Sequence, residues 1–154
     1  MKNIATIAAL IGAVSFSSHA AAQDITMAGT VISSCVLTVP TPGVLVPATD
    51  GTRIGTEEGV GGLPATLTVV ALGSTPTVNF AAPTVAGPAG ATGLTSEVAY
   101  TSAGSGANQA YTSSPSSASS DLLDSFTVQG RVSGSNGFPQ GLYTMTVTVT
   151  CSQS

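Results

Sequence analysis

Two cysteines, Cys35 and Cys151, constrain this chain most, because it has no others and they lie far apart in the sequence. Both occur where apolar and polar residues alternate. Since successive side chains of a β-strand point to opposite faces, each cysteine belongs to the core-facing set of its strand. These sets are Ile25, Met27, Gly29, Val31, Cys35, Leu37 and Val39 in the first segment, and Tyr143, Met145, Val147, Val149 and Cys151 in the last. We therefore predict a disulfide that joins the first strand to the last.

The first 22 residues predict a signal peptide. Lys2 supplies a positive charge, residues 4–16 are apolar or small, and Ala20-Ala21-Ala22 offers a cleavage site. We place cleavage after Ala22, with Ala20 as the second choice. The apolar run is shorter than the roughly 20 residues of a membrane-spanning helix, and we expect no transmembrane segment after it. The predicted location is secreted: periplasm, cell surface or extracellular space.

Export, an even cysteine count and matching parity favour a disulfide within the domain. Two alternatives stay open: a bridge between subunits, and a pair of free buried thiols. Closing such a long loop stabilises by about 4–5 kcal/mol in the chain-entropy model.

Residues 23–154 are predicted to form one all-β domain. The predicted strands cover residues 25–39, 44–46, 65–72, 77–81, 94–100, 126–132 and 142–151, with loops at 50–62 and 83–93 and a turn at Asn136-Gly137. The first of these is either one long strand or two halves with a kink near Ser33-Ser34. Residues 101–120 are rich in Ser, Gly and Ala and are predicted to be a flexible loop, and residues 121–124 a single helical turn. The number and spacing of the strands predict a single antiparallel β-sandwich, immunoglobulin-like or jelly-roll, with a closed barrel as the alternative.

Charged residues are few after the predicted cleavage. Two arginines stand against seven acidic residues, a formal net charge of −5, and the only Lys and the only His lie in the predicted signal peptide. Nucleic acid is therefore not an expected partner, because phosphate binding needs clustered basic residues. A catalytic triad, a Cys-His pair, a Schiff-base lysine and a His-containing zinc site are likewise excluded. We expect no enzyme and no cofactor.

The acidic residues leave two narrower hypotheses. Paired carboxylates can hydrolyse glycosides, but adjacent Glu57 and Glu58 point opposite ways on an extended chain, and Asp121 and Asp124 are placed as helix caps. Asp50, Glu57 and Glu58 are weak candidates for calcium ligands in a Gly-rich loop without the EF-hand pattern.

Two further surface features have simple interpretations. Thr144, Thr146, Thr148 and Thr150 share one face of the last strand, which is typical of a solvated strand face and less often of an ice- or polysaccharide-binding surface. Tyr100 and Tyr111, in or beside the predicted flexible loop, are the candidate contacts for a glycan or envelope component.

The two ends of the domain resemble a known family. The stretches GTVISSCVLTV (residues 29–39) and GLYTMTVTVT (141–150) are similar to the pilin-like β-sandwiches of chaperone–usher systems, including archaic pilins and spore coat protein U-like domains. The resemblance implies an incomplete immunoglobulin-like fold that is completed by a strand from a neighbouring subunit. Ile25, Met27, Gly29 and Val31 have the alternation of such a donor strand. Those pilins usually link the first strand to the second, whereas Cys151 lies in the last.

The expected function is therefore that of an exported, non-enzymatic structural protein of the bacterial surface or periplasm, in the form of a pilin-like subunit or adhesin. Its expected partners are further copies of itself, or a pilus or envelope assembly with a periplasmic chaperone. A self-contained, disulfide-locked domain and a small secreted glycan- or envelope-binding module are the alternatives.

Overall fold

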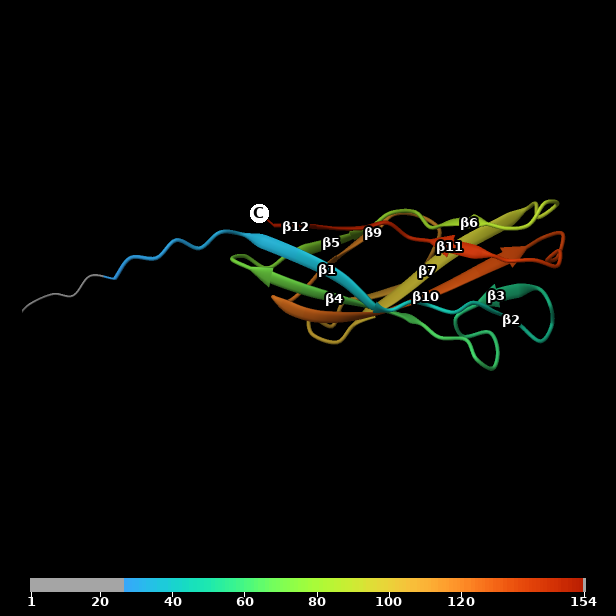
Figure 1. Ribbon diagram of the computed structural model, residues 1–154, viewed down its shortest axis with the longest axis horizontal. Coiled ribbons are helices and arrows are strands. Elements are labelled where there is room, and N and C mark those ends of the chain that lie inside the picture. Colours follow the sequence, from blue (N-terminus) through green and yellow to red (C-terminus); the bar gives the residue numbers. More distant parts are fainter. Residues whose placement is uncertain (1–26, 154) are drawn as a thin grey trace, which may run out of the picture.

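The computed structural model describes residues 27–153, so the predicted signal peptide and Ile25 lie outside the described residues. Within that range the chain is all-β, its strands pair antiparallel, and it has no helix (Figure 1). The strands are β1 (Ser34–Thr41), β2 (Val46–Pro47), β3 (Arg53–Gly55), β4 (Ala65–Leu72), β5 (Thr77–Phe80), β6 (Thr84–Ala86), β7 (Leu94–Ser102), β8 (Asn108–Thr112), β9 (Ser116–Ser119), β10 (Leu123–Gly134), β11 (Thr144–Thr146) and β12 (Val149–Ser152).

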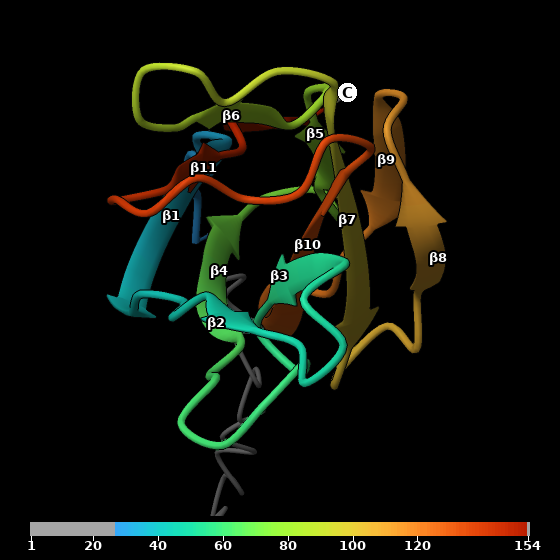
Figure 2. The ribbon, with the colours of Figure 1, turned by 90° about the vertical axis from the view of Figure 1, so that its right-hand side faces the viewer.

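Three sheets make up the molecule. The largest has seven strands in the order β1-β4-β10-β3-β2, with β7 and then β8 on the other side of β10. The long strand β10 pairs with β4 along its first half and with β3 along its second. Strands β12-β5-β9 form a second sheet and β11-β6 a third, and Figure 2 shows the molecule end-on.

The main core lies between the seven-stranded sheet and the sheet of β5, β9 and β12. Its fully buried members come from alternate positions of five strands: Leu67, Val69, Val78, Phe80, Tyr100, Ala118 and Phe126. The ring of Tyr100 stacks on Phe80 with 4.0 Å between centroids, and Phe126 meets both rings at an angle. Burying each such side chain contributes roughly 1.5–3 kcal/mol, so this aromatic cluster holds the two sheets together.

Several strand predictions are confirmed. Strand β4 has the predicted bounds, β5 is one residue shorter, and β7 extends two residues further. In β10, Phe126 and Val132 are buried while Thr127 is exposed, as the alternation predicts. Gly137 makes the predicted turn with a positive φ of 73°, and its N–H donates to the carbonyl of Gly134.

Other predictions were wrong in their boundaries. The first strand begins at Ser34, and residues 27–33 pair with nothing that the structure describes. The last segment is two strands, β11 and β12, in two different sheets. Residues 147 and 148 between them belong to neither strand, because the chain changes its pairing partner there.

Three predicted loops and the predicted helical turn also need correction. The loop at 50–62 contains β3, which pairs with β10 and buries Ile54, and the loop at 83–93 contains β6. The loop predicted at 101–120 contains β8 and β9. Its small residues give no strand pattern, but their backbone groups pair with β7 and β5. Residues 121–124 are not helical, since β10 starts at Leu123.

No part of the described chain forms a helix with the length and apolar character that crossing a membrane requires.

Candidate functional site

An apolar groove of about 620 Å³ opens between the end of β1, residues 42–45 and the last two strands. Its walls include Val39, Leu45, Val128, Tyr143 and Val147. Cavities of this size that are lined by apolar side chains are typical of binding sites. It is therefore the principal candidate site of the described molecule.

Strands β1 and β12, which lie beside each other at one end of this region, each have a free backbone edge within residues 27–153. Strand β1 pairs only with β4, and β12 only with β5. The two are joined by the disulfide between Cys35 and Cys151, with an S–S distance of 1.97 Å and a Cα–Cα distance of 6.2 Å. Free edges of this kind can each accept a further strand.

The disulfide confirms the pairing predicted from parity. Both cysteines lie on the core side of their strands, although they are half-buried and not fully enclosed. The bridge links the edges of two different sheets across 116 residues of sequence. It thus closes one end of the space between β1 and β12.

Two residues of the last segment are set firmly into the groove wall. Tyr143 donates a hydrogen bond of 2.8 Å from its hydroxyl to the carbonyl of Pro139, and its ring meets Phe138 edge-on. Met145 packs on Gly130, where an added Cβ would lie only 2.8 Å from the sulfur. The groove wall is therefore preformed, because these contacts fix both side chains.

The described part of the segment predicted as a donor or edge strand, from Met27 onward, extends away from the domain (Figure 1). Met27 is 89% exposed and Val31 77% exposed, and Gly29 has no atom within 4 Å of where its Cβ would be. The disulfide holds β1 near its start, at Cys35. Residues 27–33 precede this point and have no strand pairing.

Asp124 is not a helix cap but a buried carboxylate that organises the turn after β7. It accepts hydrogen bonds from the Ser102 hydroxyl and from the backbone N–H groups of Gly104, Ser105 and Ser125. Burial by itself raises the pKa of this carboxyl, but the hydrogen bonds outweigh burial and lower the pKa to about 2. The group is structural, since its oxygens are occupied by the protein's own donors.

The three weak calcium candidates do not converge. Asp50 accepts hydrogen bonds from the N–H and hydroxyl of Thr52, which lower its pKa. Glu57 accepts from Gln129, while Glu58 pairs with Arg53 at 3.6 Å. Within residues 27–153, no group of three or more His, Cys, Asp or Glu side chains is placed to hold a metal ion.

The two tyrosines predicted as contacts of a binding loop lie in different environments. Tyr100 is 2% exposed and belongs to the core, where its hydroxyl donates to Ser116, so its predicted contact role was wrong. Tyr111 lies on β8 with the guanidinium of Arg131 4.0 Å from its ring centre. Burial and the neighbouring Glu57 raise the pKa of Tyr111. Of the two tyrosines in the glycan-binding hypothesis, only Tyr111 remains a candidate contact.

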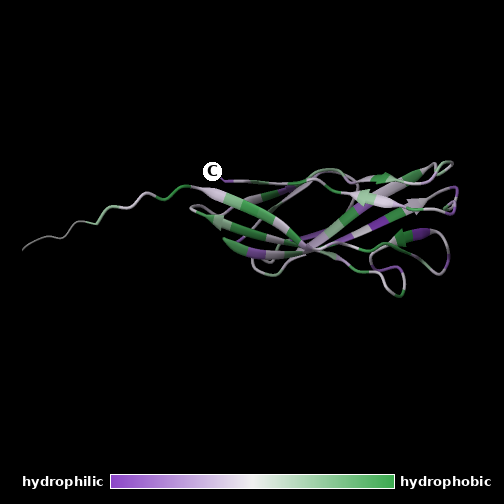
Figure 3. Cartoon of the chain, in the orientation of Figure 1, coloured by the Kyte–Doolittle hydropathy of each residue, from purple (hydrophilic) through white to green (hydrophobic). Residues whose placement is uncertain are grey.

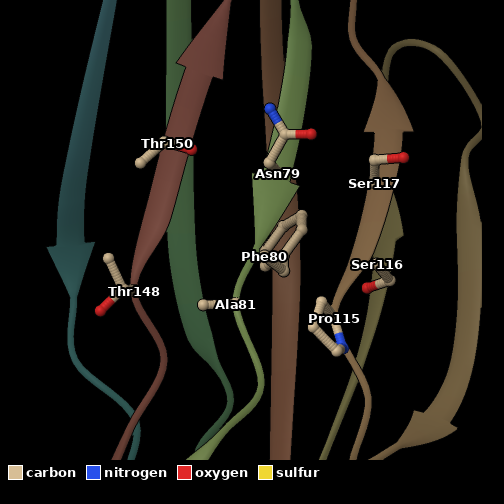
Figure 4. A pocket seen from close by; sticks show the side chains of 8 residues that line it. All are labelled: Asn79, Phe80, Ala81, Pro115, Ser116, Ser117, Thr148 and Thr150. Atoms are coloured by element: carbon tan, nitrogen blue, oxygen red, sulfur yellow. The ribbon is translucent and has the colours of Figure 1, made fainter.

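All four threonines of the row are exposed, as predicted, but Thr144 and Thr146 belong to a different sheet from Thr150 and border the apolar groove. Thr148 and Thr150 border a shallow hollow of about 450 Å³ on the outer side of the β12-β5-β9 sheet, together with Asn79 and Ser117 (Figure 4). Thr150, Asn79 and Ser117 lie directly opposite one another across the three strands. This face carries hydroxyl and amide groups and no charge, which is the character of a solvated sheet face.

The residues alone did not locate the groove. Its wall residues, such as Tyr143 and Val147, were predicted from their parity to face the core. Parity separates the two faces of a strand, but it does not show whether another strand covers the inner face. Two signals pointed to an open face: the alternating N-terminal segment before the first cysteine, and the family resemblance, which implies an incomplete fold.

Comparisons with known proteins add no relative: no family model, curated protein or solved structure matches the chain.

Proposed function

We propose that this protein is an exported, non-enzymatic structural subunit that assembles like a pilin. In this proposal the domain is an immunoglobulin-like sandwich that lacks one strand. The N-terminal segment of a second copy lies in the apolar groove and supplies that strand. The observation that carries the proposal is an apolar groove beside unpaired strand edges, in a chain whose residues 27–33 are themselves without strand pairing.

The match between segment and groove supports strand donation. Ile25, Met27, Gly29 and Val31 would all face the groove, because they share one parity. They span about 20 Å as a strand, and their apolar side chains suit walls such as Val39 and Val147. Backbone pairing along β1 or β12 would add affinity, as in other strand additions.

The chain's own groove is an unfavourable destination for its own segment. Residue 33 is followed directly by β1, whose start is held by the disulfide and by pairing with β4. To pair antiparallel with β1, residues 27–31 would have to reverse direction at Ile32-Ser33. Two-residue hairpin turns need positive φ values and favour Gly, Asn or Asp, so a β-branched Ile is unsuited to that position. Donation to another copy needs no such turn.

A pair of substitutions in adjacent residues tests the proposal. We expect the wild-type protein to form filaments that electron microscopy and sedimentation can detect. Val31→Asp places a charge on the groove-facing parity, and we expect it to abolish these filaments. Thr30→Asp, its neighbour on the opposite parity, is the matched control and should still assemble.

A second measurement isolates the groove. A variant that lacks residues 23–32 should stay monomeric, and a synthetic peptide of residues 23–33 should bind it and raise its melting temperature. The proposal fails if the full-length mature protein is a stable monomer at high concentration and the deletion changes neither folding nor assembly.

A further inference from the structure

The exposed large apolar side chains of the described residues are not scattered. Met27, Val31 and Ile32 lie on the N-terminal segment and Val39 lines the groove. The others form two groups on the domain surface. Isolated exposed apolar residues are normal, but contiguous patches mark interaction sites. The two groups are therefore candidate contact surfaces.

The first group, here named the root patch, surrounds the point where the N-terminal segment leaves. It consists of Val36, Val70, Leu72, Leu122 and Leu123, which are 44–71% exposed. Val36 lies opposite Val70 in the register of β1 and β4, and Val70 lies opposite Leu123 in that of β4 and β10. These three make one apolar row on the outer side of the sheet. Figure 3 shows apolar residues on β1, β4 and the start of β10 at the end from which the segment departs.

The second group, here named the mouth patch, consists of Val44, Val60, Leu63 and Leu142. Two backbone hydrogen bonds join Val44 to Leu63. Val44 and Leu142 line the groove, and Val60 is fully exposed on the loop after β3. The patch therefore borders the groove at Val44 and Leu142, and it continues through Leu63 onto the loop after β3.

The two patches lie apart along the long axis of the molecule. Leu63 comes just before β4 and Leu72 ends it, so the eight residues of this strand separate them by roughly 26 Å. The loop after β3 points away from the end at which the N-terminal segment departs (Figure 1). One patch cannot cover the other within a single copy.

We infer that the root patch of one copy docks on the mouth patch of the next, in a head-to-tail contact formed as the strand is donated. This inference rests on the proposed function. Val31 is only three residues before Ser34, about 10 Å of extended chain, so seating Val31 in a groove brings the root patch to the entrance of that groove. The disulfide closes the other end, which leaves the mouth patch at the entrance.

The contact joins two different surfaces of identical chains. Such heterologous contacts leave a free surface at each end of the assembly, and they produce an open filament unless the rotation closes a ring. The docked patches then hold consecutive domains at a defined angle, which a donated strand alone does not.

Glutamate substitutions in the two patches test the contact. Leu123→Glu in the root patch and Val60→Glu in the mouth patch are both surface changes outside the groove lining, so the domain should fold and melt as the wild type does. Each should raise the critical concentration for assembly at least tenfold, because a buried, unpaired charge opposes docking. Thr101→Glu, on the same outer sheet face but away from both patches, is the control and should assemble normally.

Binding of the 23–33 peptide to the variant lacking residues 23–32 tests strand donation separately from docking of the two patches. We expect Val60→Glu to leave peptide affinity unchanged while it weakens assembly. Normal assembly of both patch variants overturns the docking contact and leaves strand donation intact. Absence of peptide binding together with absence of wild-type assembly overturns both.

Discussion

Asp124 joins parts of the chain that are separate in sequence, because its carboxylate is shared by β7, the turn that follows it and β10. Its oxygens lie 2.7–2.8 Å from the donors on Ser102, Gly104 and Ser125. Several N–H and O–H donors around one buried carboxyl favour its ionised form over its protonated form. The lowered pKa of Asp124 follows from these hydrogen bonds.

The sign of the pH dependence follows from this pKa. Because the pKa falls from 3.8 to about 2 on folding, the stabilisation is complete above about pH 4 and is lost as the pH drops toward 2. The difference corresponds to about 2 kcal/mol. Urea unfolding measured at pH 5 and pH 2 should show this loss in the wild-type protein.

Asp124→Asn should destabilise the domain by about 2 kcal/mol at pH 7, because an amide NH₂ replaces an oxygen that faces donors. It should also flatten the pH dependence between 4 and 2. Asp121→Asn, an exposed neighbour, serves as the control. Equal stability of the two variants would contradict the role assigned to Asp124.

At the level of strands, the disulfide between Cys35 and Cys151 is a covalent cross-link between β1 and β12. These strands do not pair with each other, and the bridge holds the edge of one sheet to the edge of another. The groove depends on this spacing, because β1 and β12 flank it.

Replacing both cysteines by serine should cost up to about 4–5 kcal/mol of stability, the chain-entropy value for a loop of this length. Guanidinium unfolding of the double variant and of reduced wild-type protein should give the same midpoint, well below that of the oxidised protein. A double variant as stable as the oxidised protein would show that the sheets hold their spacing without the bridge.

The disulfide also bears on the family resemblance. A bridge to the last strand could immobilise the very segment that a polymerising subunit donates. The structure separates these roles at Ser34: β1 is held from Cys35 onward, and residues 27–33 stay unpaired. The bridge is therefore compatible with strand donation.

For the whole molecule, charge and apolar surface are distributed unevenly. The strands of the two smaller sheets carry no charged residue, and neither do β1 and β4, whose outer sides form most of the root patch. A predicted mature chain with a net charge of −5 repels its own copies weakly over a distance that salt shortens.

Assembly should therefore become stronger as salt is added. Sodium chloride screens the repulsion between copies, and sulfate further strengthens apolar contacts. Sedimentation at increasing salt should show a falling critical concentration. Dissociation by salt would instead indicate contacts made by ion pairs, against the apolar docking inferred above.

Local sequence was sufficient for the all-β class, for β4 and β5, and for the pairing of Cys35 with Cys151. Parity along a strand depends only on neighbouring residues, and two cysteines allow a single intrachain bridge. Strands β8 and β9 were not predictable in this way, because Ser- and Ala-rich segments become strands only when a partner strand accepts their hydrogen bonds.

The groove and the burial of Tyr100 were likewise decided by tertiary structure. Both depend on which strands meet: Tyr100 is covered by Phe80 from another sheet, whereas Val39 and Val147 face a space that no described strand fills. The alternation of residues 25–31 has the same form as that of β1, yet within the described residues β1 pairs with β4 while residues 27–33 pair with no strand. The alternating pattern of a strand is determined by its own residues, whereas its pairing partner is determined by the tertiary structure.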